Sequence, residues 1–186
     1  MDSLLTQLHF SRGEISDLDE MMVIEHASFS RPWTEGMMLA ELFNNPVAFS
    51  TIVRAGEGEK IVAQVFVRLM LDELHLLNLG VHPAWRRQGL GTQLIQHVLK
   101  TATEKGILRV ILEVRASNEA AQALYQKMGF RQIGLRKNYY CKPKENALLL
   151  GCALKEIQPF SETETKQEIE KQRKIKINSY DVINTR

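Results

Sequence analysis

Cysteine is scarce in this chain, which has only Cys141 and Cys152 among its 186 residues. Two cysteines without metal-ligand spacing give neither a zinc site nor the disulfide framework of a small secreted domain. Their scarcity favours a reducing, cytoplasmic compartment, with one disulfide between the two thiols as the less favoured alternative.

Long apolar runs are also missing. No stretch approaches the ~20 apolar residues that a membrane-spanning helix needs, and the start M-D-S-L-L-T-Q lacks the basic residues and apolar segment of a signal peptide. The formal net charge is only +2 and aromatic residues make up 7%, so neither charge nor base stacking predicts a nucleic-acid binder. His75, His82 and His97 show no metal-ligand spacing. The sequence thus predicts no membrane segment, no direct nucleic-acid contact and no metal.

What remains is an ordinary globular composition. Apolar residues make up 44% and charged residues 25% of the chain, which is typical of a folded domain, and the length suffices for one domain with its own core. We expect that domain at residues 1–158. From residue 159 to 186, charges of both signs replace the large apolar residues, which predicts a loosely ordered tail.

Apolar periodicity predicts an α+β fold with a single mixed sheet and helices packed on it. Residues with helical spacing predict helices at 17–29, 34–44, 91–105 and 118–129, with Thr34 and either Ser117 or Asn118 as N-caps and Gly106 and Gly129 at two helix ends. Apolar and β-branched runs predict strands at 6–10, 47–54, 61–71, 74–81, 107–114, 130–135 and 147–154. The last two strands are expected to be joined by a loop, K-N-Y-Y-C-K-P.

The stretch R-R-Q-G-L-G-T-Q, residues 86–93, places two glycines between a strand and a helix. The first amides of a helix lack partners inside it and its dipole favours anions, and Arg86 and Arg87 add positive charge. The spacing excludes a P-loop, because no lysine follows Gly91, and a dinucleotide-binding loop, because the third glycine is absent. A pyrophosphate fits this loop, and the alternative is an ordinary strand-to-helix turn beside solvated arginines.

The same stretch resembles the Q/R-x-x-G-x-G/A motif of the GNAT acetyltransferases, which bind the pyrophosphate of acetyl-coenzyme A on the amides of this loop. Further segments resemble the RimI group of that family, which acetylates the N-termini of ribosomal proteins: L-N-L-G-V-H-P, L-E-V-R-A-S-N, A-L-Y-Q-K-M-G-F, R-K-N-Y-Y, P-W-T-E and E-N-A-L-L-L. The resemblance spans residues 4–155. It implies the GNAT fold and acetyl-coenzyme A as the co-substrate.

The resemblance also implies which residues hold the co-substrate. The strand end Leu79, Gly80 and Val81 is expected to bind the acetyl and pantetheine groups, with the Val81 amide polarising the carbonyl. The loop residues expected at the pyrophosphate are Arg86, Arg87, Gln88, Gly89, Leu90, Gly91 and Thr92. Asn118 is expected to contact coenzyme A as well as to cap the helix that follows it.

Glu113 is the candidate catalytic base. Its strand is otherwise apolar, and a carboxylate there costs desolvation free energy unless it meets water or a partner. The strand alone favours a glutamate that faces solvent or pairs with Arg115, whereas its place in L-E-V-R-A-S-N resembles the family's catalytic glutamate. A modest base acting through water suffices for an α-amine, because the pKa of that amine is about 7.7–8.0 against about 10.4 for lysine.

Tyr125 is the candidate catalytic acid. It shares a helix face with Ala121, Leu124 and Met128, a pattern that favours core packing for an ordinary tyrosine. Within A-L-Y-Q-K-M-G-F, however, it resembles the family's tyrosine that protonates the departing thiolate. A hydroxyl at the end of a buried ring suits that role.

The peptide groove is expected beside residues 137–140, where Asn138, Tyr139 and Tyr140 resemble the family's substrate-binding segment, although the residues alone also fit an exposed hairpin. Trp33 is expected on the opposite wall, with core packing as its alternative. The resemblance implies direct acetyl transfer to the N-terminal alanine, or serine, of a small-subunit ribosomal protein, and we expect a monomer. Two alternatives stay open: a small amine or lysine as the acceptor, and a non-catalytic module that binds acyl-coenzyme A.

Overall fold

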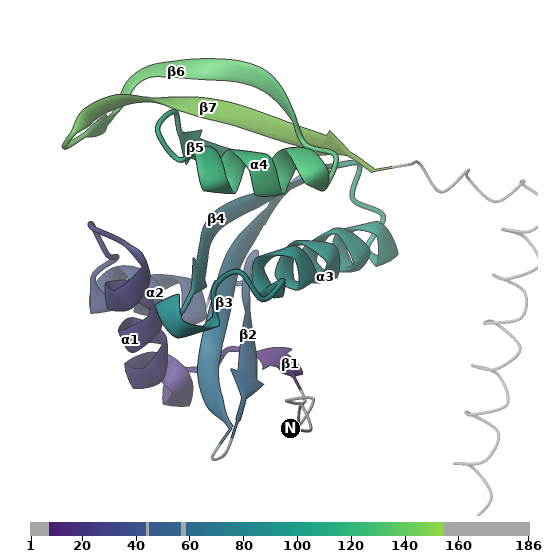
Figure 1. Cartoon of the computed structure of the whole chain (residues 1–186). Coiled ribbons are helices and arrows are strands. Elements are labelled where there is room, and N and C mark those ends of the chain that lie inside the picture. Colours follow the sequence, from purple (N-terminus) through teal and green to yellow (C-terminus); the bar gives the residue numbers. More distant parts are fainter. Residues whose placement is uncertain (1–7, 44, 57–58, 155–186) are drawn as a thin grey trace, which may run out of the picture. The chain divides into compact units, whose positions relative to one another are not determined.

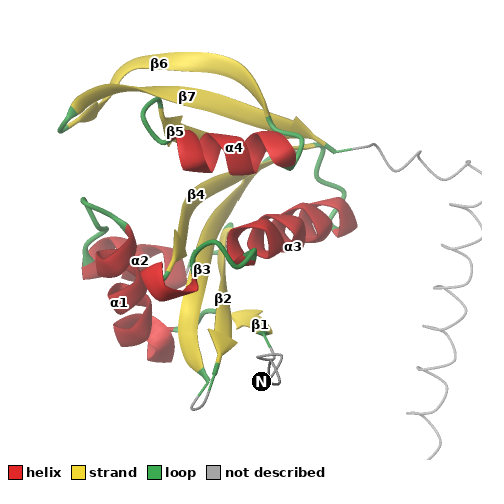
Figure 2. Cartoon of the chain, viewed as in Figure 1, coloured by secondary structure: helices red, strands yellow, loops and turns green. Residues whose placement is uncertain are grey.

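The computed structural model describes residues 8–43, 45–56 and 59–154, which build a seven-stranded sheet in the order β1-β2-β3-β4-β5-β7-β6 (Figure 1). The strands are β1 (His9–Arg12), β2 (Ala48–Ala55), β3 (Lys60–Met70), β4 (Glu73–Val81), β5 (Arg109–Arg115), β6 (Arg131–Cys141) and β7 (Lys144–Ala153). The helices are α1 (Leu18–Ser28), α2 (Glu35–Leu42), α3 (Leu90–Glu104) and α4 (Glu119–Lys127), with 3-10 turns η1 (Ile15–Asp17) and η2 (Pro83–Trp85). The predicted α+β fold with a single mixed sheet is confirmed (Figure 2). The predicted tail at 159–186, the start of the strand expected at 6–10 and the expected helix end at Asn44 lie outside the described residues.

The helix ends follow local chemistry. Thr34 Oγ1 accepts a hydrogen bond from Met37 N at 3.2 Å, and Asn118 Oδ1 accepts one from Ala121 N at 3.2 Å, as N-caps do. Gly106 and Gly129 adopt φ angles of +70° and +89° just past α3 and α4, in the left-handed conformation that glycine favours at helix C-termini. These predictions are confirmed, with Asn118 rather than Ser117 as the cap of α4.

The sheet parts in its middle, between β4 and β5. These two strands are the parallel pair, and they are in register only from Glu73 to Leu76 on β4, opposite residues 109–112 of β5. Beyond that point β4 continues along β3 alone, and its register shifts so that Asn78 faces Phe66 while Leu76 faces Val67. Leu77 is therefore the extra residue of a β-bulge, a feature that bends a strand away from its neighbour. Figure 1 shows β4 running away from β5 past this region.

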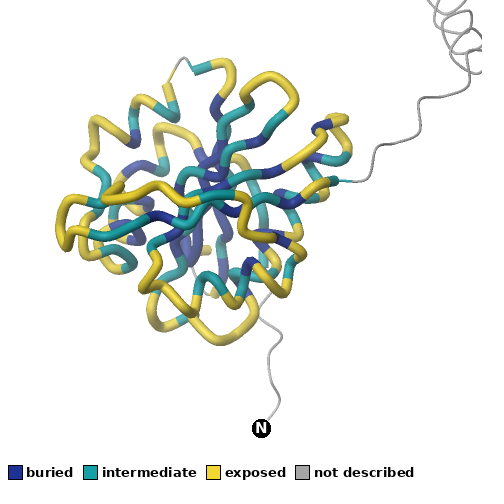
Figure 3. The backbone as a smooth tube through the Cα atoms, turned by 90° about the horizontal axis from the view of Figure 1, so that it is seen from above, coloured by how far each residue is buried: buried dark blue, intermediate teal, exposed yellow. Residues whose placement is uncertain are grey.

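Two pairs of helices cover opposite faces of the sheet. Strand β3 contributes to two buried clusters, with Phe66 in one and its neighbours Val65 and Val67 in the other, because neighbouring side chains of a strand point to opposite faces. The cluster below α1 and α2 contains Leu18, Met21, Ile24, Met38, Ile52, Ile61 and Phe66. The larger cluster, beside α3 and α4, includes Ala63, Val65, Leu94, Ile95, Val98, Val110, Leu112, Tyr125 and Phe130. Figure 3 shows these buried segments gathered in the middle of the described unit.

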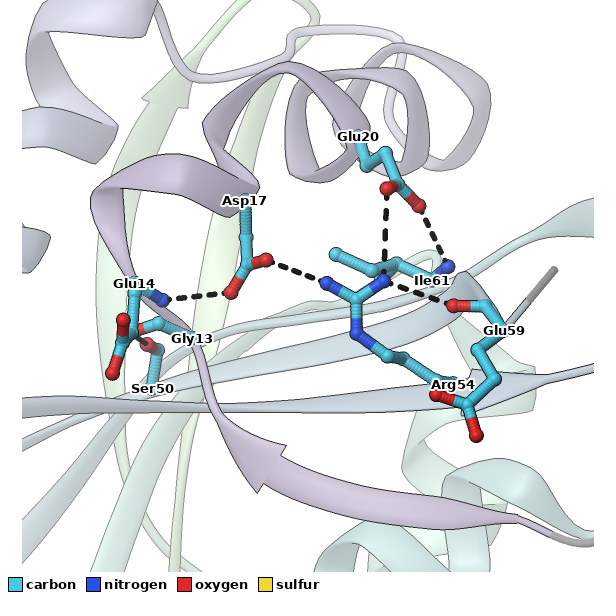
Figure 4. A network of polar contacts seen from close by, with 8 residues as sticks. All are labelled: Gly13, Glu14, Asp17, Glu20, Ser50, Arg54, Glu59 and Ile61. Carbon is cyan, nitrogen blue, oxygen red and sulfur yellow. Dashed lines mark hydrogen bonds and ion pairs between the residues drawn. The ribbon is translucent and has the colours of Figure 1, made fainter.

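An arginine on β2 fastens the start of α1 to the sheet (Figure 4). Arg54 Nη2 lies 2.5 Å from Asp17 Oδ1, and its Nη1 donates to the backbone oxygen of Glu59 at 2.9 Å and lies 3.6 Å from Glu20 Oε1. Glu20 Oε2 in turn accepts a hydrogen bond from Ile61 N at 3.0 Å. The first turn of α1 is thus tied to β2 and β3.

The predicted loop at residues 137–140 is wrong. Strand β6 runs from Arg131 to Cys141, and only the two residues between Cys141 and Lys144 form the turn into β7. The register shifts between Arg136 and Tyr140, and Asn138 takes a positive φ of 54° with its amide donating to Asn146 Oδ1 at 2.9 Å. The strand predicted at 130–135 therefore continues to Cys141. This continuation was not predicted because β6 is an edge strand whose residues are mostly exposed, so its sequence has the polar composition of a loop.

Candidate active site

The loop before α3 presents free amides. Gly89, with a φ of +86°, is the N-cap of α3 and no side chain caps this helix. The first intrahelical bond is donated by Gln93 N to Gly89 O at 3.0 Å, so the amides of Leu90, Gly91 and Thr92 precede the helical ladder. The uncapped start of a 15-residue helix is an anion-binding position.

The loop's own side chains brace its backbone. Arg86 Nε donates to Val81 O at 3.0 Å, and Gln88 Nε2 donates to Ala84 O at 3.0 Å. Arg87 is exposed and has a φ of 63°. Arg86 therefore links the loop to the end of β4, while its charge and that of Arg87 stay at the start of α3.

The two glycines of the loop serve different purposes. Gly89 has open space around the position of a Cβ atom, with Gln93 Nε2 nearest at 4.0 Å, so its positive φ is what requires glycine. At Gly91 a Cβ atom would lie 3.1 Å from Leu124 Cδ2. Gly91 thus allows α4 to approach the first turn of α3.

The end of β4 lies against α1. A Cβ atom on Gly80 would lie 3.1 Å from Ile24 Cγ2 and 3.4 Å from Phe29 Cε2, and Ser28 Oγ donates to Val81 O at 3.2 Å. The space that Gly80 leaves is therefore occupied by the end of α1. Leu79 and Val81 are half-buried and pack toward the cluster beside α3.

Glu113 lies on β5, where the sheet has already parted. Its side chain is 21% exposed, and Oε1 lies 3.1 Å from Arg136 Nη2 of β6. Arg115 instead pairs with Glu145 Oε2 at 3.1 Å, so the alternative in which Glu113 pairs with Arg115 is wrong. Glu113 thus combines partial burial, an arginine partner and access to solvent.

Tyr125 is 6% exposed and belongs to the main buried cluster. Its ring centroid lies 5.6 Å from that of Phe130, so the packing role that the helix face predicts is confirmed. Burial, and next the neighbouring Tyr140, raise the pKa of the Tyr125 hydroxyl. The hydroxyl therefore stays protonated at neutral pH, and the raised pKa makes it a weaker acid than an ordinary tyrosine.

Tyr139 and Tyr140 form an edge-to-face pair with centroids 5.1 Å apart. Arg115 Cζ lies 3.9 Å from the centre of the Tyr140 ring, and Arg136 Cζ lies 5.5 Å from that of Tyr139, within the range of cation–π attraction. Burial raises the pKa of Tyr140, Arg115 lowers it, and Tyr139, Glu113 and Glu145 raise it. Strand β6 therefore brings the tyrosine pair and the candidate base into one electrostatic neighbourhood.

Glu145 braces this neighbourhood from β7. Its Oε1 accepts a hydrogen bond from Ser117 N at 2.5 Å, and its Oε2 accepts one from Arg115 Nη1 at 3.1 Å. The bonds from Ser117, followed by the Arg115 guanidinium, lower the pKa of Glu145. Glu145 thereby connects the β6–β7 hairpin to the segment that leads into Asn118 and α4.

Trp33 follows α1 and packs on the other half of the sheet. Its ring is half-buried and lies 5.2 Å from the Phe66 ring. Its amide donates to Glu25 Oε1 at 2.8 Å, and Glu25 also accepts hydrogen bonds from Gln64 Nε2 at 3.2 Å and Asn78 Nδ2 at 3.0 Å. Sequence reasoning missed this buried group, although Leu18, Met21, Glu25 and Ser28 recur with the spacing of one helix face.

The expected residues thus fall into separate groups. Tyr140 of β6 lies near enough to Tyr125 of α4, to Glu113 of β5 and to Tyr139 for their charges to interact. The glycine loop and Leu79–Val81 lie along β4 and the start of α3. Trp33 belongs to the β1–β4 half, so the two expected walls of the groove come from the two halves of the sheet. Cys141 and Cys152 are free thiols. Within the part of the chain that the structure describes, no His, Cys, Asp and Glu side chains gather as a metal site would require, and no helix is long and apolar enough to cross a membrane.

Residues 18–130 match the profile of the Acetyltransferase (GNAT) family. The chain belongs to the GNAT acetyltransferase family. The resemblance and the fold expected from the loop motif are therefore confirmed.

Within this family, the chain is similar to several N-terminal acetyltransferases. The chain is 37% identical over 141 residues to a [Ribosomal protein bS18]-alanine N-acetyltransferase of Haemophilus ducreyi, covering 74% of this chain and 94% of that protein. It is 33% identical over 140 residues to the protein of that name from Escherichia coli K12, covering 74% and 92%. The crystal structure of the Escherichia coli ribosomal-protein-S18-alanine N-acetyltransferase superposes with a TM-score of 0.75 at 29% identity, covering 83% of this chain and 99% of that one. Arabidopsis thaliana NAA60, crystallised with acetyl-CoA, shares the fold with a TM-score of 0.72 at 20% identity, over 80% of this chain and 99% of that one.

Proposed function

We propose that this GNAT chain transfers the acetyl group of acetyl-coenzyme A directly to the α-amine of the N-terminal alanine of ribosomal protein bS18. The observation that carries the proposal is the grouping of a half-buried carboxylate, Glu113, with a tyrosine pair and a firmly protonated tyrosine. Relatives at 33% and 37% identity that carry this activity in their names support the choice of acceptor.

The co-substrate would bind along β4 and the start of α3. Its pyrophosphate fits the free amides of Leu90, Gly91 and Thr92, with Arg86 and Arg87 supplying charge and Gln88 and Gly89 shaping the loop. Its pantetheine and acetyl groups would follow Leu79, Gly80 and Val81, on the stretch of β4 that β5 has left. Asn118 would face the same ligand from the start of α4. Acetyl-coenzyme A supplies the thioester, and no metal has a part in this proposal.

Proton transfer is divided between two side chains. As the amine nitrogen bonds to the thioester carbonyl carbon and the C–S bond breaks, Glu113 takes the amine proton through a water molecule. Tyr125 gives a proton to the departing thiolate. Arg136 occupies Glu113 Oε1, which leaves Oε2 as the oxygen available to the water. A carboxylate suffices because the α-amine has a pKa of about 7.7–8.0.

The acceptor peptide would lie between the two halves of the sheet. Asn138, Tyr139 and Tyr140 would form one wall and Trp33 the other. We also propose that the protein acts as a monomer. A cytoplasmic location is part of the same proposal, because its acceptor is a ribosomal protein.

The acceptor class can be tested directly. Purified protein with acetyl-coenzyme A is offered an alanine-starting peptide, a serine-starting peptide, the same peptide with a blocked N-terminus and an internal lysine, and a polyamine, and products are located by mass spectrometry. We expect acetylation of the free α-amine, with alanine favoured. Equal rates on lysine or polyamine would overturn the acceptor, and binding of acetyl-coenzyme A without transfer to any of them would favour the non-catalytic module.

A further inference from the structure

Glu25 stands out because it is the one acidic or basic residue buried among the described positions, at 1% exposure. An isolated buried carboxylate is costly, and its usual compensation is a cation. Glu25 instead meets neutral donors: Trp33 N at 2.8 Å, Gln64 Nε2 at 3.2 Å, and Asn78 Nδ2 at 3.2 Å and 3.0 Å from its two oxygens. Stabilisation of the fold alone therefore does not account for a buried glutamate of this kind.

We propose that Glu25 is a positioning residue for the acceptor peptide: it fixes the loop that carries Trp33 against β3 and against β4 beside the bulge at Leu77. The inference rests on the proposed function, because it assigns Trp33 to the wall of the peptide groove. Glu25 itself touches neither substrate.

The loop depends on Glu25 for its internal anchor. Phe29 N donates to Glu25 O at 3.1 Å at the end of α1, and Met38 N returns to Thr34 O at 3.1 Å at the start of α2. Between these two bonds the Trp33 amide finds its acceptor in the Glu25 carboxylate. The same residue therefore holds the loop through its backbone and through its side chain, and it sets where the Trp33 ring meets Phe66.

The strand side of the network is held independently. Asn78 follows the bulged Leu77 and faces Phe66, and Gln64 faces Gly80, so both amides sit on strands that are paired in register. Removing Glu25 would leave this β3–β4 ladder intact while releasing the loop. Peptide binding should consequently suffer more than binding of acetyl-coenzyme A, which is assigned to β4 and the start of α3.

Two buried acceptor oxygens beside Glu25 make Glu25→Gln a conservative substitution. Gln64 Oε1 and Asn78 Oδ1 are buried and have no hydrogen-bond partner among the residues that the structure describes. Glu25→Gln keeps the shape of the side chain and keeps one oxygen for the Trp33 amide. Its new NH2 group can donate to Gln64 Oε1 or Asn78 Oδ1 if the side-chain amide of that residue rotates by half a turn, so that its oxygen faces residue 25. This substitution should therefore preserve the loop without the charge.

The experiment compares Glu25→Ala, Glu25→Asp and Glu25→Gln in the full chain, using an alanine-starting peptide and acetyl-coenzyme A. We expect Glu25→Ala to raise the KM for peptide about tenfold, the equivalent of about 1.4 kcal/mol, while the Kd for acetyl-coenzyme A changes less than about twofold. Glu25→Asp, which retains the charge but shortens the reach, should give a smaller rise in the same KM. Glu25→Gln should have a KM for peptide close to that of the wild type.

Glu20→Ala is the matched control, because it removes a carboxylate of the same helix that binds Ile61 N rather than the loop. It should lower Tm and leave the KM for peptide and the Kd for acetyl-coenzyme A unchanged.

The outcomes separate the two proposals. An unchanged peptide KM in folded Glu25→Ala, or equal losses of peptide and acetyl-coenzyme A binding, would overturn the role of Glu25. If Glu25→Ala does not fold, Glu25→Asp decides in the same way. If the wild-type protein does not acetylate the peptide at all, the proposed function is wrong and the inference is wrong with it. If the wild-type protein is active and the Glu25 variants have the same KM for peptide, only the inference is wrong.

Discussion

The two halves of the sheet place their glutamate carboxylates in opposite environments. In the β1–β4 half, β3 is buried from Ile61 to Val67, and Glu25 is sealed among neutral amides. In the β5–β7–β6 half, the edge strand is largely exposed, and Glu113 and Glu145 are each paired with an arginine. The comparison teaches that one side chain type performs two tasks: a sealed carboxylate can hold a loop in place, whereas a carboxylate in reach of solvent can exchange protons.

The strongest way to test this division is to neutralise a carboxylate in each half. Glu113→Gln retains size and removes the basic oxygen, so kcat should fall about 10²-fold or more, as expected for loss of a general base. Glu25→Gln should leave kcat near wild type. The measurement is the release of the coenzyme A thiol at saturating concentrations of both substrates, and equal losses in the two variants would contradict the comparison.

The Kd for acetyl-coenzyme A serves as the control for Glu113→Gln. It should be unchanged, because Glu113 is assigned to the amine and not to the co-substrate. Wild-type turnover in this variant would remove Glu113 from the proposed mechanism.

Loss of the Tyr125 hydroxyl should have a smaller effect. Tyr125→Phe keeps the ring that packs on Phe130, so Tm should change little. We expect kcat to fall about tenfold, less than for the base, because a thiol with a pKa near 8.5 leaves readily as the thiolate. Single-turnover transfer rates measure this step, and a full rate in folded Tyr125→Phe would restrict Tyr125 to packing.

The glycine loop offers a weaker but selective test. Gly89 and Gly106 flank α3, adopt φ angles of +86° and +70°, and leave open space where a Cβ would stand. Alanine at either position should destabilise the fold by about 1–2 kcal/mol, the cost of a left-handed conformation. Only Gly89→Ala should also raise the KM for acetyl-coenzyme A, by about fivefold to tenfold, or about 1 kcal/mol, because it disturbs the amides that begin α3. A similar rise in Gly106→Ala would show that general destabilisation, and not the loop, controls the constant.

Local patterns in the sequence were enough to predict most of the fold. The apolar runs of β3, β4 and β5 and the amphipathic face of α3 show their periodicity over a few residues, and caps such as Thr34 and Asn118 act within one turn. The first part of β6 was predicted as the strand at 130–135, but its continuation to Cys141 was missed because its composition is polar and most of its residues are exposed. Its bulge near Asn138 depends on a partner in β7, which a local pattern does not reveal.

The site was predictable only in part, for a related reason. Glu113 and Tyr125 stood out through motifs, but their environment depends on residues distant in the chain. Arg136 reaches Glu113 only because β7 lies between β5 and β6, and Glu25 reaches Asn78 only because α1 lies across β4. Such pairings follow from topology, so the ion pair and the buried network could be found only in the folded chain.

The smallest expected effects concern stability against pH, where the two halves should respond with opposite sign. Burial raises the pKa of Glu25 above its ordinary value of 4.5, and hydrogen bonds from Ser117 lower that of Glu145. A raised acid pKa favours the folded state at low pH, and this contribution is lost as pH rises from 4.5 through the folded value. A lowered pKa contributes stability above 4.5, and that stability is lost as pH falls through the folded value.

The free energy of unfolding of Glu25→Gln, measured relative to that of the wild type, should therefore increase from pH 4 to pH 7. For Glu145→Gln the same difference should decrease. Urea unfolding midpoints at the two pH values measure both differences, and Glu119→Gln, at an exposed position at the start of α4, serves as the control for removing a carboxylate. Parallel changes in the two variants would mean that the halves do not differ in how they hold their carboxylates, since a raised pKa at Glu25 and a lowered pKa at Glu145 must act on the free energy of unfolding in opposite directions.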